Sequence, residues 1–408
     1  MKKVRCLLSH RRNTHIPTLC KREKRKSGRP NFCRALIIGG VSMCTLFACG
    51  QKGAKIAVSE DAGDLKGLLS KPDRKNVKTV DSEHALKEAI KKGGEEVNLT
   101  IPKGTAIRLS SVVLIEEGKE VNIEGEENVT IDGNKNTRLF EILPKATLRI
   151  KHVTLTGGTA IADDGEEAWG GAILNTGWLF VDDCIFRDNT AQAGGAIFNG
   201  NKKDTGGGLM LIGGSVFTGN SAELLGGAIL NISNRSPVMI ENSTFENNTA
   251  YSGGALYNMA GLVAVNWSFF ALNKATQTGG AIHNDGGYLL INGKKDDQPD
   301  GKKSVFRNNE ADQHGGAIAN QKGGVYLLDG YVLSENTATW GGAVFNEEEG
   351  SIHLREVEIK GNAASKGEDI FNHSTGEKVI IENATAEKTH GSNFTHGKVD
   401  LSPFQKPE

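Results

Sequence analysis

The chain has 408 residues, of which 52 are glycine and only 9 are proline, and the glycines follow no three-residue period. This composition excludes a collagen-like protein and suits a fold with many tight turns. The net charge is −1, but the residues before Cys49 hold 12 Lys and Arg against one Glu, so the remainder is acidic. An acidic body argues against nucleic acid as a partner, because phosphate binding requires clustered basic side chains.

The first predicted element is an apolar run over residues 35–48, which follows a basic segment ending at Arg34. The run is too short to span a membrane but suits the core of a secretory signal. It ends in Leu46-Phe47-Ala48-Cys49-Gly50, which resembles a bacterial lipobox. The resemblance implies a lipid on the Cys49 sulfur, cleavage after Ala48 and, because Gly50 is not Asp, sorting to the outer membrane. An ordinary signal peptide (residues 1–48) with a free Cys49 is the alternative.

Residues 49–76 are polar and predict a flexible tether. Asp81-Ser82, followed by apolar residues at 85, 86, 89 and 90, predicts a short helix near 82–92 that caps the first coil of a solenoid. Short apolar strands are then expected at 97–101, 107–109, 121–123, 129–131, 140–142, 148–150 and 153–155. Only Cys184 remains in the body, so neither an intrachain disulfide nor a zinc cluster is expected there.

A repeat occupies residues 155–372. The motif Gly-Gly-Ala-aliphatic-x-Asn begins at Gly170, Gly194, Gly226, Gly253, Gly279, Gly315 and Gly341, with a degenerate copy at Gly367. An apolar-x-x-Asn motif precedes each copy after the first, at 186–189, 217–220, 245–248, 270–273, 306–309, 333–336 and 359–362. Steps of 24 to 36 residues suit one coil of a parallel β-solenoid, with polar inserts at Asn201–Gly208 and Lys294–Lys303 in the longest two.

We therefore predict an all-β fold, a right-handed parallel β-helix over residues 77–383 with a short N-terminal capping helix and a polar tail at 384–408. It should have roughly 11 coils and form a rod of ~50 Å. The Phe residues of the second motif should stack in the interior. The last Asn of each first motif should form a hydrogen-bonded ladder: Asn175, Asn199, Asn231, Asn258, Asn284, Asn320, Asn346 and Asn372.

One residue per coil, between the aliphatic residue and the ladder Asn, should point away from the ladder. These residues are Leu174, Phe198, Leu230, Tyr257, His283, Ala319, Phe345 and Phe371. The alternation predicts a mostly apolar outer stripe that could bind a partner. The alternative is that the chain bends at the Asn or that a neighbouring loop covers the row, because an uncovered stripe would aggregate.

The paired GGA[ILV] and FxxN motifs resemble those of the chlamydial polymorphic outer membrane proteins. The entry segments Val129–Gly133 and Leu155–Gly158 are similar to bacterial β-helix proteins of the pectate-lyase-like superfamily. The first resemblance implies exported repeats that take part in adhesion to host cells. We expect the lipid on Cys49, rather than a C-terminal translocator, to be the anchor. The expected protein is a non-catalytic lipoprotein of the outer membrane or cell surface that binds a host or cell-surface protein or a polysaccharide.

A polysaccharide lyase or glycoside hydrolase is the alternative function, because many β-helix proteins are such enzymes. Hydrolysis requires carboxylates that converge on one face. The sequence offers Asp163-Asp164, Asp182-Asp183 and an Arg149-Ile150-Lys151 segment similar to a polygalacturonase motif, but in the wrong order, and its histidines are scattered. We therefore expect no catalytic site, cofactor or metal. The acidic insert 294–303 is expected to be a solvated loop rather than a Ca²⁺ site.

Overall fold

The computed structural model describes residues 34–38, 41–45, 69, 74–160, 168–201, 208–234, 236–293, 304–373, 379–386, 388–391 and 394–396. The chain divides into two units, Met1–Leu68 with Asp400–Glu408, and Leu69–Val399. In the first unit, β1 (Arg34–Ile38) pairs with β2 (Val41–Thr45) as an antiparallel hairpin. This hairpin falls in the predicted signal segment, which remains a prediction.

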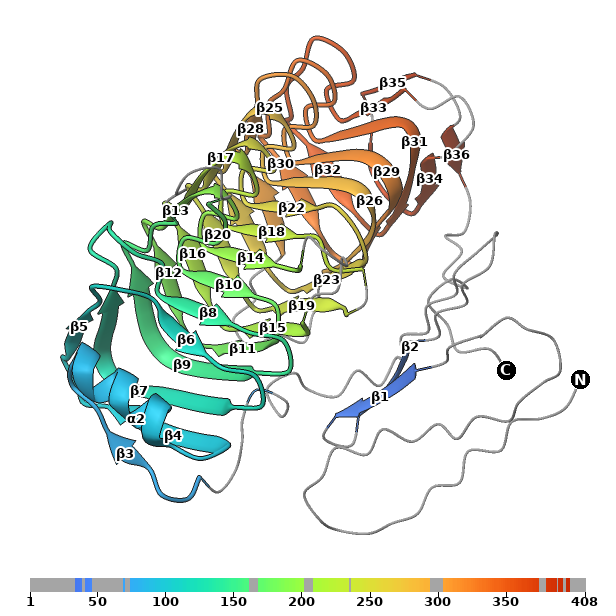
Figure 1. Cartoon of the computed structure of the whole chain (residues 1–408). Helices are drawn as coiled ribbons and strands as arrows, with labels where there is room; N and C mark the ends of the chain where they lie inside the picture. The colour runs from blue at the N-terminus through green and yellow to red at the C-terminus, as the bar shows by residue number, and fades with distance from the viewer. Residues whose placement is uncertain are drawn as a thin grey trace, which may run out of the picture. The chain divides into compact units, whose positions relative to one another are not determined.

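The second unit is a right-handed parallel β-helix of about 10 turns, as predicted (Figure 1). Each complete coil contributes one strand to each of three faces, and every pairing between coils is parallel. We name the faces after the motifs they contain: the FxxN face, the GGA face and the third face. A short corner sheet follows the FxxN face and precedes the Gly-Gly pair. Strands β7, β9, β26, β29 and β31 continue around a bend and belong to two faces.

The FxxN face consists of β5 (Ala106–Arg108), β7 (Glu120–Asp132), β9 (Thr147–Thr156), β12 (Ile185–Arg187), β16 (Val216–Thr218), β20 (Thr244–Glu246), β24 (Phe269–Ala271), β27 (Val305–Arg307), β30 (Val332–Ser334) and β32 (Glu358–Lys360). The GGA face consists of β6 (Val113–Ile115), β8 (Phe140–Ile142), β10 (Ile173–Asn175), β14 (Ile197–Asn199), β18 (Ile229–Asn231), β22 (Leu256–Asn258), β26 (Ile282–Asn292), β29 (Ile318–Leu328), β31 (Val344–Arg355), β33 (Ile370–Asn372) and β35 (Thr389–Gly391).

The third face consists of β3 (Lys78–Thr79), β4 (Glu96–Ile101), β11 (Trp178–Asp182), β15 (Met210–Gly213), β19 (Val238–Glu241), β23 (Leu262–Asn266), β34 (Val379–Glu382) and β36 (Phe394–His396), together with the five shared strands. The corner sheet consists of β13 (Thr190–Ala193), β17 (Ser221–Leu225), β21 (Thr249–Ser252), β25 (Lys274–Thr278) and β28 (Glu310–Ala311).

The predicted cap is present as α2 (Glu83–Lys92). Ser82 begins the helix by accepting a hydrogen bond from the Ala85 N–H, and the helix buries Leu86 and Ile90. Glu83 accepts hydrogen bonds from Lys87 at 2.6 Å and from the Ser110 hydroxyl at 3.0 Å. These contacts attach the first turn of the helix to the loop after β5 and shield the first coil.

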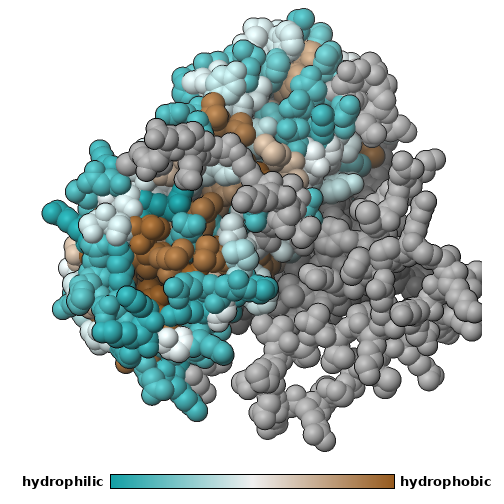
Figure 2. All heavy atoms as spheres, viewed as in Figure 1, coloured by the Kyte–Doolittle hydropathy of each residue, from teal (hydrophilic) through white to brown (hydrophobic). Residues whose placement is uncertain are grey.

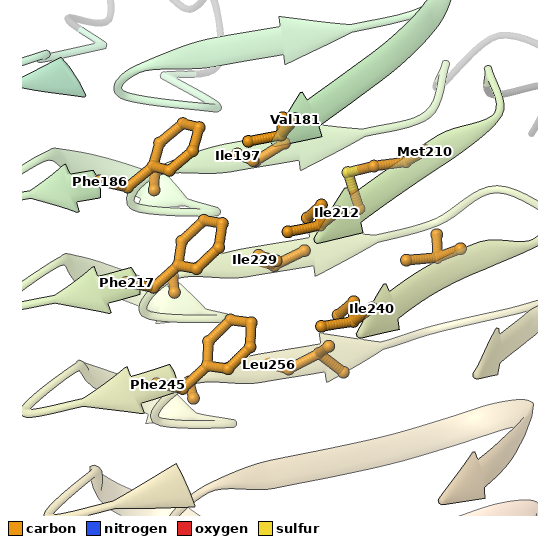
Figure 3. Packing of buried hydrophobic residues seen from close by; sticks show 14 of the residues in the cluster. Val181, Phe186, Ile197, Met210, Ile212, Phe217, Ile229, Ile240, Phe245 and Leu256 are labelled. Carbon is orange, nitrogen blue, oxygen red and sulfur yellow. The ribbon is translucent and has the colours of Figure 1, made fainter. Parts of the chain in front are cut away.

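The predicted Phe column fills the interior. Phe186, Phe217, Phe245, Phe270 and Phe306 stack with ring centroids 4.6–4.7 Å apart, close to the strand spacing of ~4.8 Å. Aliphatic side chains from the other two faces point toward the same column (Figure 3). The parallel register repeats each interior position in the next coil, so the core is a stack of layers with the same arrangement of side chains.

The predicted Asn ladder is also present, with Nδ2 donating to Oδ1 of the next coil at 2.7–2.9 Å in all seven steps from Asn175 to Asn372. The Asn residues of the FxxN motifs form a second ladder with six steps of 2.9–3.0 Å, from Asn189 to Asn362. In this second ladder each Oδ1 also accepts the backbone N–H of the preceding Asn, as Asn248 does from Asn220 at 3.1 Å. The amides thus satisfy polar groups at buried bends.

The Gly-Gly pair has two separate steric reasons. Gly226 has φ +64°, a conformation that favours glycine, and a Cβ on Gly227 would lie 2.0 Å from the Gly254 oxygen of the next coil. One predicted boundary is wrong: the solenoid does not end at 383, because β35 and β36 pair in parallel with β33 and β34. These last strands lack both motifs, so nothing in the repeat pattern marked them.

Candidate interaction surface

The row expected to form an exposed stripe lies on the outer side of the GGA face. The parallel register aligns Leu174, Phe198, Leu230, Tyr257, His283, Ala319, Phe345 and Phe371 in successive coils. Several of them form a hydrophobic cluster separate from the interior core. Leu174 is partly buried, but the other seven are between 1 % and 7 % exposed. The row points away from the interior, but it is covered, so the alternative of a covered row holds and the exposed stripe does not.

For three residues of the row, an aromatic residue or histidine immediately before a Gly-Gly pair explains this burial. Trp169 stacks on Phe198 with ring centroids 4.4 Å apart. His314 stacks on Phe345 at 4.3 Å, and Trp340 lies 5.5 Å from the Phe371 ring. In each pair the covering ring comes from the coil that precedes its partner. The end of the corner sheet therefore folds over the GGA face and removes the row from any partner.

The polar members of the row are also held within the protein. The Tyr257 hydroxyl donates to Oδ2 of Asp285 at 3.2 Å, and the His283 ring stacks on Tyr257 at 4.6 Å. His283 Nδ1 lies 2.8 Å from the Thr278 hydroxyl. Burial lowers the pKa of His283 to about 4, so the ring is neutral at pH 7. These contacts make the row a structural layer.

The row reaches exposed positions at both ends: at the C-terminal end, Phe371 lies in register with the exposed His390 of β35. Leu114 in β6 is exposed, and it lies in register with Glu141 and then with the partly buried Leu174. Hydrophobic residues are visible at the surface on this face, which carries β8 and β10 (Figure 2). The covering residues begin with Trp169, so the coils below β10 have no equivalent cover among the described residues.

Exposed apolar side chains concentrate elsewhere in the solenoid. Among the described residues, the exposed large hydrophobics are Val77, Leu114, Ile185, Leu224, Tyr251, Met259, Trp267 and Leu272. Five of these eight lie between 224 and 272, in three successive coils. They lie at different bends of these coils: Leu224 and Tyr251 belong to the corner sheet, Met259 follows the GGA face, and Trp267 and Leu272 flank one strand.

Two of these residues also have an unfavourable backbone conformation. Trp267 has φ 50° and Leu272 has φ 55°, in the left-handed region. The position of Trp267 in the other coils is held by His152, Asp183, Gly214, Asn242, Asp329, Glu356 and Asn383. The position of Leu272 is held by Asp188, Gly219, Asn247, Asn308, Glu335 and Gly361. Only this coil places bulky hydrophobic residues where the backbone favours Gly, Asn or Asp.

Trp267 and Leu272 lie on either side of β24. Between them Phe270 joins the interior column, while Phe269 points outward in register with Thr244 and Val305 and is partly exposed. We name Trp267, Phe269 and Leu272 the β24 patch.

Charged residues border the β24 patch. Glu246 and Arg307 lie in register on either side of the buried Ala271. Beyond Leu272, Lys274 forms an ion pair with Glu310 at 2.8 Å. An apolar centre with a charged rim is the usual composition of a protein-binding surface.

One of the acidic residues considered for catalysis, Asp183, lies with Glu124 and His152 at a different site. Glu124, His152 and Asp183 line a hollow of about 610 Å³ beside the bend between the third and FxxN faces. His152 lies 4.0 Å from Glu124 and 3.5 Å from Asp183, and these three side chains are 43 %, 44 % and 50 % exposed. An enzyme site normally excludes water from its reacting groups. The exposure of this cluster therefore favours a solvated ionic surface over a hydrolase site.

The basic residues near this hollow have structural partners. Lys151 forms an ion pair with Asp182 at 2.8 Å. The Arg149 guanidinium lies 3.6 Å from the centroid of the Phe180 ring, and burial lowers its pKa. Neither Lys151 nor Arg149 is therefore placed to act as a general base. In the described part of the chain, no group of three or more His, Cys, Asp or Glu residues is arranged to hold a metal ion.

Several sequence predictions lie outside the described residues. These are the lipidation site Cys49, the Asp163-Asp164 pair, and the inserts' central parts, including the acidic segment 294–303. Within the described ranges, no helix combines the length and apolar character needed to cross a membrane.

Comparison with known proteins gives one match. The repeat model of the Chlamydia polymorphic membrane proteins matches residues 242–259. This segment contains Phe245–Asn248 and the following Gly-Gly-Ala motif, and it forms the coil directly below the β24 patch. No curated protein and no solved structure gives a match. The chain is thus a β-helix with repeats of the polymorphic membrane protein type.

Proposed function

We propose that this protein is a surface-associated, non-catalytic β-helix that binds a protein partner through the β24 patch. The observation that carries the proposal is the pair of exposed, bulky residues in the left-handed region, Trp267 and Leu272. The match to a polymorphic membrane protein repeat supports the surface association. A lipid on Cys49 would provide the membrane anchor, and the patch would provide adhesion.

Energetics support a binding role for the two residues. A left-handed conformation disfavours a residue with a Cβ by about 1–2 kcal/mol. Trp267 and Leu272 still expose 37 % and 48 % of their surface, so hydrophobic burial offsets this cost only in part. Asn242 and Asn247 show that the same bends form with residues that tolerate this conformation. Backbone strain of this kind concentrates at functional sites.

The chemistry of the patch favours a protein over a polysaccharide. It combines an indole and a benzyl group with the branched aliphatic Leu272, on a parallel sheet face bordered by charged side chains. Aromatic anchors surrounded by a polar rim are typical of protein interfaces.

The test is a double variant, Trp267→Asn with Leu272→Asn, which copies Asn242 and Asn247 of the coil below. We expect at least a 10-fold loss of adhesion of protein-coated beads to cultured host cells, with an unchanged or raised melting temperature. The control is Ile185→Thr, because Ile185 is an exposed residue of the same face and its neighbour in β9 is Thr154.

Two results would contradict the proposal. Unchanged adhesion of the double variant would show that the patch is not the binding surface. A marked loss of thermal stability would show that Trp267 and Leu272 are structural. Protease treatment of the cells separates the partner classes, because binding that survives protease but not glycosidase treatment would indicate a polysaccharide.

A further inference from the structure

The outer side of the third face contains a gap in its row of side chains. In register across successive strands, this row consists of Glu124, Lys151, Asp182, Gly213 and Glu241. Gly213 therefore leaves a space between the side chains of Asp182 and Glu241, both of which are buried. Neighbouring Leu211 also points outward, because Met210 and Ile212 face the interior, and it is almost fully buried as well. Buried residues on the outer side of a sheet require another layer above them.

Leu69 occupies this gap. A Cβ on Gly213 would lie 2.4 Å from Cδ1 of Leu69, and Leu69 itself is only 6 % exposed. The absence of a side chain at residue 213 is therefore what allows the leucine to enter the row. Leu69 precedes the capping helix in the chain, yet it lies against a strand several coils further along the solenoid.

Five residues later, the chain is attached to the same row nearer its N-terminal end. Arg74 forms an ion pair with Glu124 at 3.0 Å, and its side chain is only 14 % exposed. The Lys75 carbonyl accepts a hydrogen bond from Nδ2 of Asn98 at 2.9 Å. Glu124 and Gly213 are three strands apart, which is ~14 Å. Five residues reach at most ~18 Å, so one short stretch of chain is long enough to make both contacts.

We propose that Leu69 and Arg74 form a latch that fastens the N-terminal segment of this chain to the third face. The occupant of this face is the chain itself, because Leu69 fills the gap at Gly213 and Arg74 pairs with Glu124. Tension applied to the N-terminal segment then acts on the flank of β15 instead of on the capping helix.

Cross-linking of the full-length protein tests the latch. A Leu69→Cys and Gly213→Cys pair should form a disulfide under mild oxidation, because the cysteine at 69 lacks the Cδ1 that meets Gly213. The control pair, Leu69→Cys with Thr218→Cys, places the second thiol on the FxxN face of the same coil and should not form one. Equal cross-linking of both pairs, or none of the first, would overturn the proposal.

Proteolysis provides a second measurement that does not depend on a disulfide. Trypsin should cut after Arg74 at least 10-fold faster in Leu69→Asp than in the natural protein. Leu224→Asp is the control, because Leu224 is exposed on the corner sheet and the same substitution there should leave this cleavage unchanged. Cleavage at the natural rate in Leu69→Asp would show that Leu69 does not hold the segment.

Discussion

Replacing Asn248 with alanine should destabilise the solenoid more than most single substitutions. Asn248 is fully buried in the middle of the second ladder. Its Nδ2 donates to the Phe217 carbonyl at 2.9 Å and to Asn273 Oδ1 at 3.0 Å. Its Oδ1 accepts from Nδ2 and from the backbone N–H of Asn220 at 3.0 and 3.1 Å. The substitution removes four hydrogen bonds and leaves a buried backbone N–H without that acceptor.

The magnitude follows from these four bonds. Each contributes about 1 kcal/mol net, and a buried donor left unsatisfied adds about 1–3 kcal/mol. We therefore expect a loss of about 5 kcal/mol in the free energy of unfolding. Asn258→Ala should lose about 2 kcal/mol, because Asn258 makes only two ladder bonds, with Asn231 and Asn284. Asn247→Gly is the control, since Asn247 is exposed and has φ 56°.

Chemical denaturation of the purified body measures these differences through the transition midpoint at constant slope. The expected order of destabilisation is Asn248→Ala, then Asn258→Ala, then Asn247→Gly with almost none. If Asn248→Ala costs no more than Asn258→Ala, the additional bonds of the second ladder contribute nothing. The assignment of the FxxN asparagine as the stronger structural element would then be wrong.

Three further predictions concern single groups. Burial acts to raise the pKa of Glu83, but hydrogen bonds from Lys87 and Ser110 outweigh it and lower the pKa to about 2. The contribution of this carboxylate to stability should thus be complete above the ordinary pKa of 4.5 and lost as the pH falls toward 2. When the melting temperature is measured at decreasing pH, it should therefore fall less steeply in Glu83→Gln than in the natural protein. Burial raises the pKa of the Cys184 thiol to about 12, so iodoacetamide should label Cys184 only after unfolding, and rapid labelling of the native protein would contradict its burial. Cys49→Ser should abolish incorporation of labelled palmitate and leave a precursor; membrane fractionation of a processed Cys49→Ser protein would refute the lipobox interpretation.

The repeat made the architecture predictable before any coordinates. A recurring Phe at a constant position predicts an interior stack, and a recurring Asn predicts a ladder, because each coil repeats the environment of the last. The asparagines of the FxxN motifs recur just as regularly as those of the GGA motifs. The second ladder was missed because the sequence analysis assigned a ladder only to the GGA asparagines. The strands after 383 were missed because they carry neither motif.

The surface was harder to predict, because it depends on contacts between coils. Alternation along a strand correctly directed Phe198 and Phe345 outward but could not show that Trp169 and His314 cover them. The covering residues lie in the preceding coil, beyond a bend whose angle the sequence does not encode in any simple pattern. The β24 patch did leave a signal: aligning the bends of the coils shows Trp267 and Leu272 at positions otherwise held by polar residues or by glycine. The contact of Leu69 with Gly213 left no such signal in the sequence.

The ladders have a consequence for how such a molecule changes in evolution. The same amide bond of 2.8 Å joins Asn284 to Asn320 across 36 residues and Asn320 to Asn346 across 26. The bond depends on how the coils stack in space and does not depend on the number of residues between the two asparagines. Unequal crossing-over between two asparagine codons would therefore delete or duplicate a whole coil while creating only junctions of a kind already present. The length of the rod can vary in this way without any change in its cross-section.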